Sequence, residues 1–106
     1  MGKEAGNLDA AFLRKVRPVL REMGFAGEKE ALKEQVLLLL LSKISRYEAE
    51  CAFFEKKYGM SLEEFVKHLE SHEKEDFEKE DDLLDWRFAS ETLDELKQRV
   101  QEIERA

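Results

Sequence analysis

The chain has 106 residues, of which 41% are charged and 42% are apolar, and its formal net charge is −7. The length allows one ordinary domain and excludes two, and the apolar share is enough for a packed core, which excludes wholesale disorder. Residues 1–47 carry nine Lys/Arg and six Asp/Glu, whereas residues 48–106 carry nine and nineteen. The acidic second half disfavours nucleic acid as a partner and favours a basic protein.

Cysteine content and hydropathy restrict the expected location of the protein. The single cysteine, Cys51, cannot form an internal disulfide, so we expect the reduced cytoplasm. The first residues, MGKEAGN, do not resemble a secretory leader. The longest apolar run, VLLLLL at residues 36–41, is far shorter than the about 20 residues that a membrane span needs, so we expect no membrane insertion.

The first expected helix starts at Asn7 or Asp9, either of which can cap it, and ends at Gly24. Pro18 is expected to bend or restart this helix. Its basic side chains could contact nucleic acid or an acidic partner, but no aromatic residues or glycines accompany them, and we interpret them as a solvated face. They are Arg14, Lys15, Arg17 and Arg21.

The longest uninterrupted segment, residues 28–58, contains no glycine or proline and is rich in strong helix formers, so it predicts one long helix. Residues that alternate in steps of three and four form a heptad seam along it. The seam consists of Leu37, Leu40, Ile44, Tyr47, Cys51, Phe54 and Tyr58. Cys51 is therefore interpreted as a small core residue rather than a nucleophile. Beside the seam runs a second line, mostly of small residues that allow close approach of another helix: Leu38, Leu41, Ser45, Ala49 and Ala52.

The leucine run at residues 36–41 predicts self-association. Consecutive helical residues turn by about 100°, so this run is apolar in every direction, and packing on one side would leave two or three leucines in water. Each exposed leucine forgoes about 1.5–3 kcal/mol of burial. We therefore predict a homodimer in which Leu38, Leu39 and Leu41 lie between the two chains.

A short helix is expected after Gly59, which can end the long helix in the left-handed conformation. Ser61 and Glu64 match a capping box that starts this short helix, which should end near His72. His68 and His72 lie four residues apart on it and could share a zinc or nickel ion. The sequence fixes no third ligand, so we interpret them as surface histidines without a metal.

The last helix is expected to begin between Asp76 and Asp82 and to continue to about Arg105. It carries a second heptad seam, formed by Trp86, Ala89, Leu93, Leu96, Val100 and Ile103. Two long seams with a short helix between them predict an antiparallel pair. The expected fold class is all-α, a long antiparallel helical hairpin or bundle of about four helices, two of them long, that dimerises. A flexible tail at residues 1–7 should precede a single helical domain at residues 8–105.

The acidic segment at the start of the last helix is the strongest candidate for a binding surface. Six carboxylates between residues 76 and 85 face one lysine, Lys79, so a basic partner would steady them. The residues expected to bind such a partner are Asp76, Glu78, Asp81, Asp82 and Asp85. Trp86 and Phe88 could add an aromatic anchor, although a core role is the main expectation for Trp86.

The same acidic residues also admit an enzymatic interpretation. All-α nucleotide pyrophosphatases of the MazG type hold magnesium with paired glutamates on one helix and an E-x-x-D on another. Glu78 and Asp81 match the second element, and Glu63 with Glu64 begins the first, but its third glutamate should stand at Lys67. Carboxylates at a helix start are also favoured by the helix dipole alone. In this alternative the site forms between subunits from Glu48, Glu50, Glu78 and Asp81 or near neighbours.

The phrases FEKKYGMSLEEF at residues 54–65 and EDDLLDW at residues 80–86 resemble a group of short archaeal and bacterial helical proteins, some of which are suspected antitoxins encoded beside small toxins. The resemblance covers roughly residues 43–103 and consists of a helix end, a cap and an acidic helix start, so it assigns no functional residue. We therefore expect a non-catalytic, antitoxin-like homodimer that binds a basic, ribonuclease-like or similar protein, with no cofactor and no metal. The alternatives are the MazG-like pyrophosphatase and a coiled-coil scaffold subunit.

Overall fold

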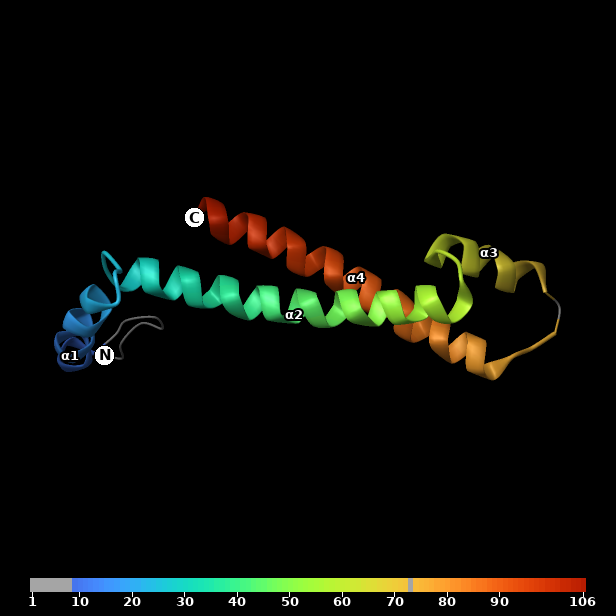
Figure 1. Ribbon diagram of the computed structural model, residues 1–106, viewed down its shortest axis with the longest axis horizontal. Coiled ribbons are helices and arrows are strands. Elements are labelled where there is room, and N and C mark those ends of the chain that lie inside the picture. The colour runs from blue at the N-terminus through green and yellow to red at the C-terminus, as the bar shows by residue number, and fades with distance from the viewer. Residues whose placement is uncertain (1–8, 73) are drawn as a thin grey trace, which may run out of the picture. The chain divides into compact units, whose positions relative to one another are not determined.

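The computed structural model describes residues 9–72 and 74–106. These residues form four α-helices and no strand (Figure 1): α1 (Ala10–Glu22), α2 (Glu28–Tyr58), α3 (Leu62–Ser71) and α4 (Phe77–Arg105). The predicted all-α fold with two long helices is confirmed. The predicted tail at residues 1–7 lies outside the described residues.

The chain divides into two compact units, with the boundary inside α2 between Val36 and Leu37. In the first unit, α1 begins where the Asp9 carboxylate accepts a hydrogen bond of 2.8 Å from the backbone N–H of Ala11. The helix passes through Pro18 without a break, and Gly24, with φ of +93°, follows its end. The single domain expected for residues 8–105 stays a prediction.

In the second unit, the ends of the helices follow from short polar motifs. Gly59 ends α2 with φ of +66°, a left-handed conformation that glycine adopts at little steric cost. Ser61 and Glu64 form the predicted capping box: the Ser61 hydroxyl accepts from the Glu64 N–H, and the Glu64 carboxylate accepts from the Ser61 N–H. Asp76 caps α4 by accepting a hydrogen bond of 3.2 Å from the Lys79 N–H.

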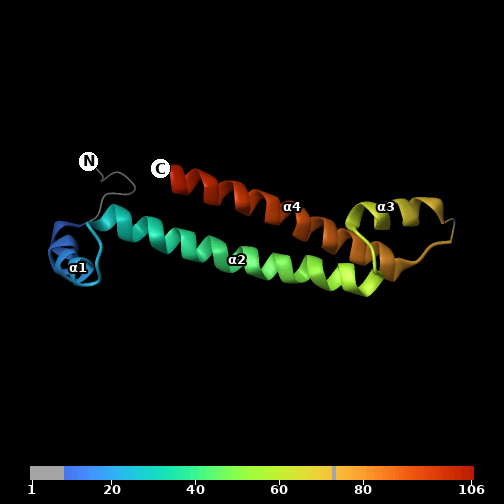
Figure 2. The same cartoon turned by 45° about the horizontal axis from the view of Figure 1, so that its top comes forward.

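From Leu37 onward, α2 runs antiparallel to α4 (Figure 2). The Phe54 ring stacks on Trp86 with 5.7 Å between centroids, and the Tyr58 hydroxyl donates to the Asp82 carboxylate, so four residues forward in α2 correspond to four residues backward in α4. The same register places Cys51 opposite Ala89 at the next layer. Every predicted seam residue of both helices is buried or partly buried, which confirms the two heptad seams.

The core of this unit is an aromatic cluster where α2, α3 and α4 meet. Phe65 is 0% exposed and Trp86 is 1% exposed, and their ring centroids lie 5.4 Å apart. Phe54 of α2 belongs to the same cluster, and the ring of Tyr58 lies 4.2 Å from that of Phe65. Burial of such large rings dominates core energetics, so this junction fixes the arrangement of the three helices around it.

The leucine run of α2 is only partly covered within one chain. Leu37 and Leu40, which belong to the seam, are partly buried. Leu38, Leu39 and Leu41 remain 54%, 59% and 50% exposed. Across residues 9–72 and 74–106, every helix is too short or too polar to cross a membrane.

Candidate protein-binding surface

The acidic start of α4 is partly neutralised by a lysine from the end of α2. The ammonium group of Lys57 lies 2.6 Å from the Asp82 carboxylate and 3.0 Å from that of Glu78. The Tyr58 hydroxyl donates a second hydrogen bond to Asp82, whose side chain is only 16% exposed. This cluster ties the C-terminal end of α2 to the N-terminal turns of α4, directly beside the aromatic core.

The proton equilibria of this cluster follow from its contacts. The hydrogen bonds from Lys57 and then Tyr58 hold the pKa of Asp82 below its usual range. The same pairing with Asp82, and secondarily with Glu78, raises the pKa of Lys57. Burial, followed by the bond to Asp82, raises the pKa of Tyr58 to about 12. At neutral pH the cluster therefore holds a carboxylate, an ammonium group and a phenol that acts as donor.

Substituting Asp82 by asparagine should lower the free energy of unfolding by about 1.5–3 kcal/mol, the usual contribution of hydrogen bonds to a charged group. Because the folded-state pKa of Asp82 is depressed, its stabilisation is present above its unfolded-state pKa of about 3.9 and is lost as the pH falls through the folded-state value. Urea unfolding at pH 7 and at decreasing pH measures both effects. The difference between wild type and variant should be largest at pH 7.

Asp81→Asn is the matched control for this prediction, because Asp81 is exposed and no hydrogen bond or ion pair joins it to a described residue. It should change the free energy of unfolding by less than about 0.5 kcal/mol. Equal effects of the two substitutions would contradict the assignment of a structural role to Asp82.

The five predicted partner-binding carboxylates therefore divide into two groups. Asp76 caps α4, and Glu78 and Asp82 pair with Lys57, so all three have structural partners inside the chain. Asp81 and Asp85 are exposed, and no described residue forms a hydrogen bond or an ion pair with them. These two are the carboxylates that remain available to a partner.

Large apolar side chains lie on the same side of α4 as these two carboxylates. Phe77, Leu84 and Phe88, spaced by seven and four residues, are 70%, 65% and 61% exposed. Helical periodicity puts Phe77 and Leu84 on the side of α4 away from the seam. Phe88 and Asp85 lie at the edge of this side next to α2, with Asp81 between Asp85 and Leu84 around the helix. We call this set of five residues the α4 face.

The two predicted aromatic anchors have different positions. Trp86 lies in the core, as expected, and is 1% exposed. Phe88 lies on the surface, where its ring meets the edge of Tyr47 with 6.1 Å between centroids. Asp85 and Phe88 line one side of a groove of about 230 Å³, whose other side is formed by Arg46, Tyr47, Glu50 and Phe54. A partner side chain inserted at Phe88 would thus meet aromatic rings together with charged groups of both signs.

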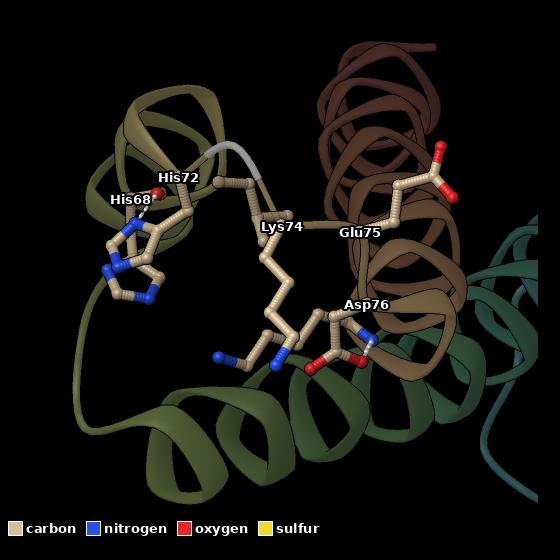
Figure 3. Close-up of a pocket in the computed structure, with 7 residues that line it drawn as sticks. His68, His72, Lys74, Glu75 and Asp76 are labelled. Atoms are coloured by element: carbon tan, nitrogen blue, oxygen red, sulfur yellow. Dashed lines mark hydrogen bonds between the residues drawn. The ribbon is translucent and has the colours of Figure 1, made fainter.

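A second hollow, of about 220 Å³, lies where α3 approaches the start of α4 (Figure 3). The rings of His68 and His72 are tilted against each other there, with 4.1 Å between centroids. His72 Nδ1 lies 2.7 Å from the His68 carbonyl oxygen and donates a hydrogen bond to it when Nδ1 carries the proton. Burial, and then the charges of His72 and Lys79, lower the pKa of His68. Glu75 points away from the histidines in this view.

The two histidines and the acidic residues are the candidate metal ligands of the sequence. In the part of the chain that the structure describes, no three His, Cys, Asp or Glu side chains are close enough together to hold a metal ion. Of the carboxylates in the pyrophosphatase interpretation, Glu78 is paired with Lys57 and Glu48 lies 3.9 Å from Lys97. Glu64, in the paired-glutamate element, is held by the capping box, which lowers its pKa.

Two other candidate groups have local structural roles. The Arg17 guanidinium of the basic first helix makes an ion pair of 2.7 Å with Glu28. Burial, followed by the charges of Glu55 and Glu50, raises the pKa of the Cys51 thiol, so the thiol stays protonated and is a poor nucleophile. The interpretation of Cys51 as a partly buried seam residue agrees with its position.

Phe88 was identified from the sequence, but the other two apolar residues of the α4 face and the pairing of Lys57 were not. Phe77 and Leu84 were not selected, although their spacing relative to Phe88 could have shown that they lie opposite the seam. The pairing of Lys57 with Asp82 follows only from the register of α2 against α4. Comparison of the chain with protein-family models, curated proteins and solved structures finds no match.

Proposed function

We propose that the protein is a non-catalytic, antitoxin-like interaction module that forms a homodimer and binds a basic protein partner in the cytoplasm. The observation that supports this function is the α4 face, where three large apolar side chains are each more than 60% exposed beside two carboxylates that bond to no described residue. Isolated exposed apolar residues are common, but a line of them along one helix marks an interaction surface.

The chemistry of the α4 face defines the kind of partner that fits it. Full burial of one large, exposed apolar side chain contributes about 1.5–3 kcal/mol. Phe77, Leu84 and Phe88 would each contribute a large part of this on binding, provided that the partner presents an apolar surface to them. Asp81 and Asp85 would accept hydrogen bonds from Lys or Arg at the rim and accelerate encounter with a positive surface. A segment that alternates basic and apolar side chains meets both conditions, whereas the phosphate backbone of nucleic acid would be repelled.

The homodimer belongs to the same proposal. Leu38, Leu39 and Leu41 are at least half exposed in the single chain, and a second chain would remove them from water. Two copies of the α4 face in one dimer would allow bivalent binding, which raises the overall avidity for a dimeric or repeated partner. The free thiol of Cys51 is consistent with a reducing compartment.

Charge reversal on the α4 face tests the proposed function. The partner is first isolated from native cells with the tagged protein, identified, and purified for binding measurements. Asp81→Lys combined with Asp85→Lys should lower its association rate about tenfold or more at low salt, and Phe88→Ala should increase its dissociation rate, because rim charges act on encounter and buried anchors act on residence. The salt dependence of the wild-type affinity should be steeper than that of the double variant.

Glu95→Lys combined with Glu102→Lys is the matched control, since it makes the same charge change on the same helix at two exposed carboxylates farther along. This variant should bind within about twofold of wild type if binding is confined to the α4 face. Asp82→Lys is unsuitable, because it would also break the ion pair with Lys57. Binding that is insensitive to salt and to both Asp81 and Asp85 would refute the proposed surface.

A further inference from the structure

The side of α2 that does not face α4 carries a line of exposed apolar and small residues. Leu38 and Leu41 at one end of this line are 54% and 50% exposed. The remaining members, toward the other end, are small and also exposed: Ser45, Ala49 and Ala52. We call these five residues the α2 line.

The α2 line is arranged symmetrically about Ser45, with large residues on one side and small residues on the other. Leu38 precedes Ser45 by seven residues, and Ala52 follows it by seven. Leu41 precedes Ser45 by four residues, and Ala49 follows it by four. A second α2 laid antiparallel with Ser45 opposite Ser45 therefore pairs one leucine with one alanine at each layer on either side of the central serine pair.

This pairing of large with small residues keeps the two helix axes at one separation along the contact. A parallel arrangement would instead place Leu38 against Leu38 and Ala52 against Ala52. The helices would then be held apart at the leucine end and leave a gap at the alanine end, which costs packing contacts. The order of residues thus favours the antiparallel arrangement.

The side chains next to the α2 line extend the same complementarity. Leu39 and Phe53 are 59% and 60% exposed, and helical periodicity puts both on the same flank of the line. In an antiparallel pair related by a twofold axis, equal flanks of the two helices meet. Leu39 of one copy would therefore contact Phe53 of the other, so that all three exposed leucines of the run, Leu38, Leu39 and Leu41, gain apolar neighbours.

The line continues along α2 to two residues of opposite charge. Glu34 precedes Ser45 by eleven residues, and Lys56 follows it by eleven. No hydrogen bond or ion pair joins either of them to a described residue of the same chain. The antiparallel arrangement brings the glutamate of one copy to the lysine of the other, twice per dimer, whereas a parallel arrangement would bring equal charges together.

We propose that two copies of this chain associate through α2 in antiparallel orientation, with a twofold axis passing at Ser45. The proposal rests on the homodimer proposed above and specifies its geometry. A second copy of the chain is the partner that explains these observations. The large and small residues and the opposite charges are placed symmetrically about Ser45, so each group meets its complement when the partner is an identical helix. A foreign helix would need no such order in α2 itself.

Disulfide cross-linking between cysteine variants tests this geometry in the full chain. In a Cys51→Ala background, Leu38→Cys and Ala52→Cys chains are purified separately, mixed, and oxidised with glutathione disulfide. The mixture should form a covalent dimer, because opposed residues of the two helices come within the Cα separation of about 4.4–6.8 Å that a disulfide needs. Each variant alone should not cross-link, because its two copies would lie about 21 Å apart along the helices.

Ser45→Cys should cross-link to itself at a rate at least tenfold above that of Lys43→Cys, an exposed control position off the α2 line. Circular dichroism of every variant verifies that helicity is unchanged. Rapid self-cross-linking of Leu38→Cys, with none in the mixture, would establish a parallel arrangement and overturn the inference while the dimer remains. A wild-type chain of monomeric mass in light scattering would overturn the homodimer itself, and the inference with it.

Charge exchange provides a readout that is independent of thiol chemistry. Glu34→Lys should weaken dimerisation by at least threefold, and so should Lys56→Glu, because each places like charges together twice per dimer. The double variant, Glu34→Lys with Lys56→Glu, should restore the wild-type dissociation constant within about twofold. Additive weakening in the double variant would contradict the proposed pairing.

Discussion

Replacing Trp86 by alanine is expected to lower the free energy of unfolding by about 3–5 kcal/mol, the range for deletion of a buried aromatic ring. Trp86 is 1% exposed and contacts Phe54, Tyr58 and Phe65 from two other helices, so its loss would leave a cavity that no single helix can close. Urea unfolding followed by circular dichroism measures the change. Wild type and variant are compared at one protein concentration, because the stability of a dimer depends on concentration.

Phe88→Ala is the control for this prediction. It also removes an aromatic ring from α4, two residues away, but Phe88 is 61% exposed and its one ring contact is an edge contact to Tyr47. Its effect on unfolding should stay below about 1 kcal/mol, as is usual for surface positions. Similar losses in the two variants would show that the aromatic junction does not carry the stability of this unit.

A wild-type mass near twice 12.5 kDa and a monomeric mass for the Leu38→Glu, Leu41→Glu variant are expected in light scattering at micromolar concentration. Each leucine is about half exposed, so a dimer would recover about 1 kcal/mol per side chain, and four such side chains lie in one dimer. Their loss corresponds to about a thousandfold increase in the dissociation constant. The four introduced carboxylates would add mutual repulsion and a desolvation cost.

Leu84→Glu is the matched control, because Leu84 is a leucine with 65% exposure on the α4 face rather than on α2. This variant should keep the dimeric mass while it weakens binding of the basic partner. If Leu84→Glu lost the dimer while the Leu38→Glu, Leu41→Glu variant kept it, the self-association surface would lie on α4 and not on α2.

The sequence by itself determined the helices and their ends, because these depend on interactions between residues close in the chain. The uninterrupted run at residues 28–58 forms one helix, and Gly59, with its positive φ, ends it. The Ser61 and Glu64 capping box is formed by partners three residues apart. The sequence placed the start of α4 only between Asp76 and Asp82, and in the structure Asp76 caps it through the N–H of Lys79. The two heptad seams were readable for the same reason, since a periodic apolar pattern identifies the buried side of a helix without knowledge of its partner.

Only the tertiary structure decided which acidic and aromatic residues remain available to a partner. Asp81 and Asp82 are neighbours in the sequence, but Asp82 pairs with Lys57 of α2, while Asp81 is exposed and pairs with no residue that the structure describes. Trp86 and Phe88 differ in the same way, one filling the junction with α3 and the other exposed. The physical reason is that each residue of a helix turns by about 100°, which separates Asp81 from Asp82 by about 100° and Trp86 from Phe88 by about 200°. The register and rotation of α4 against α2 and α3 therefore select one residue of each pair for the core or an ion pair and leave the other on the surface.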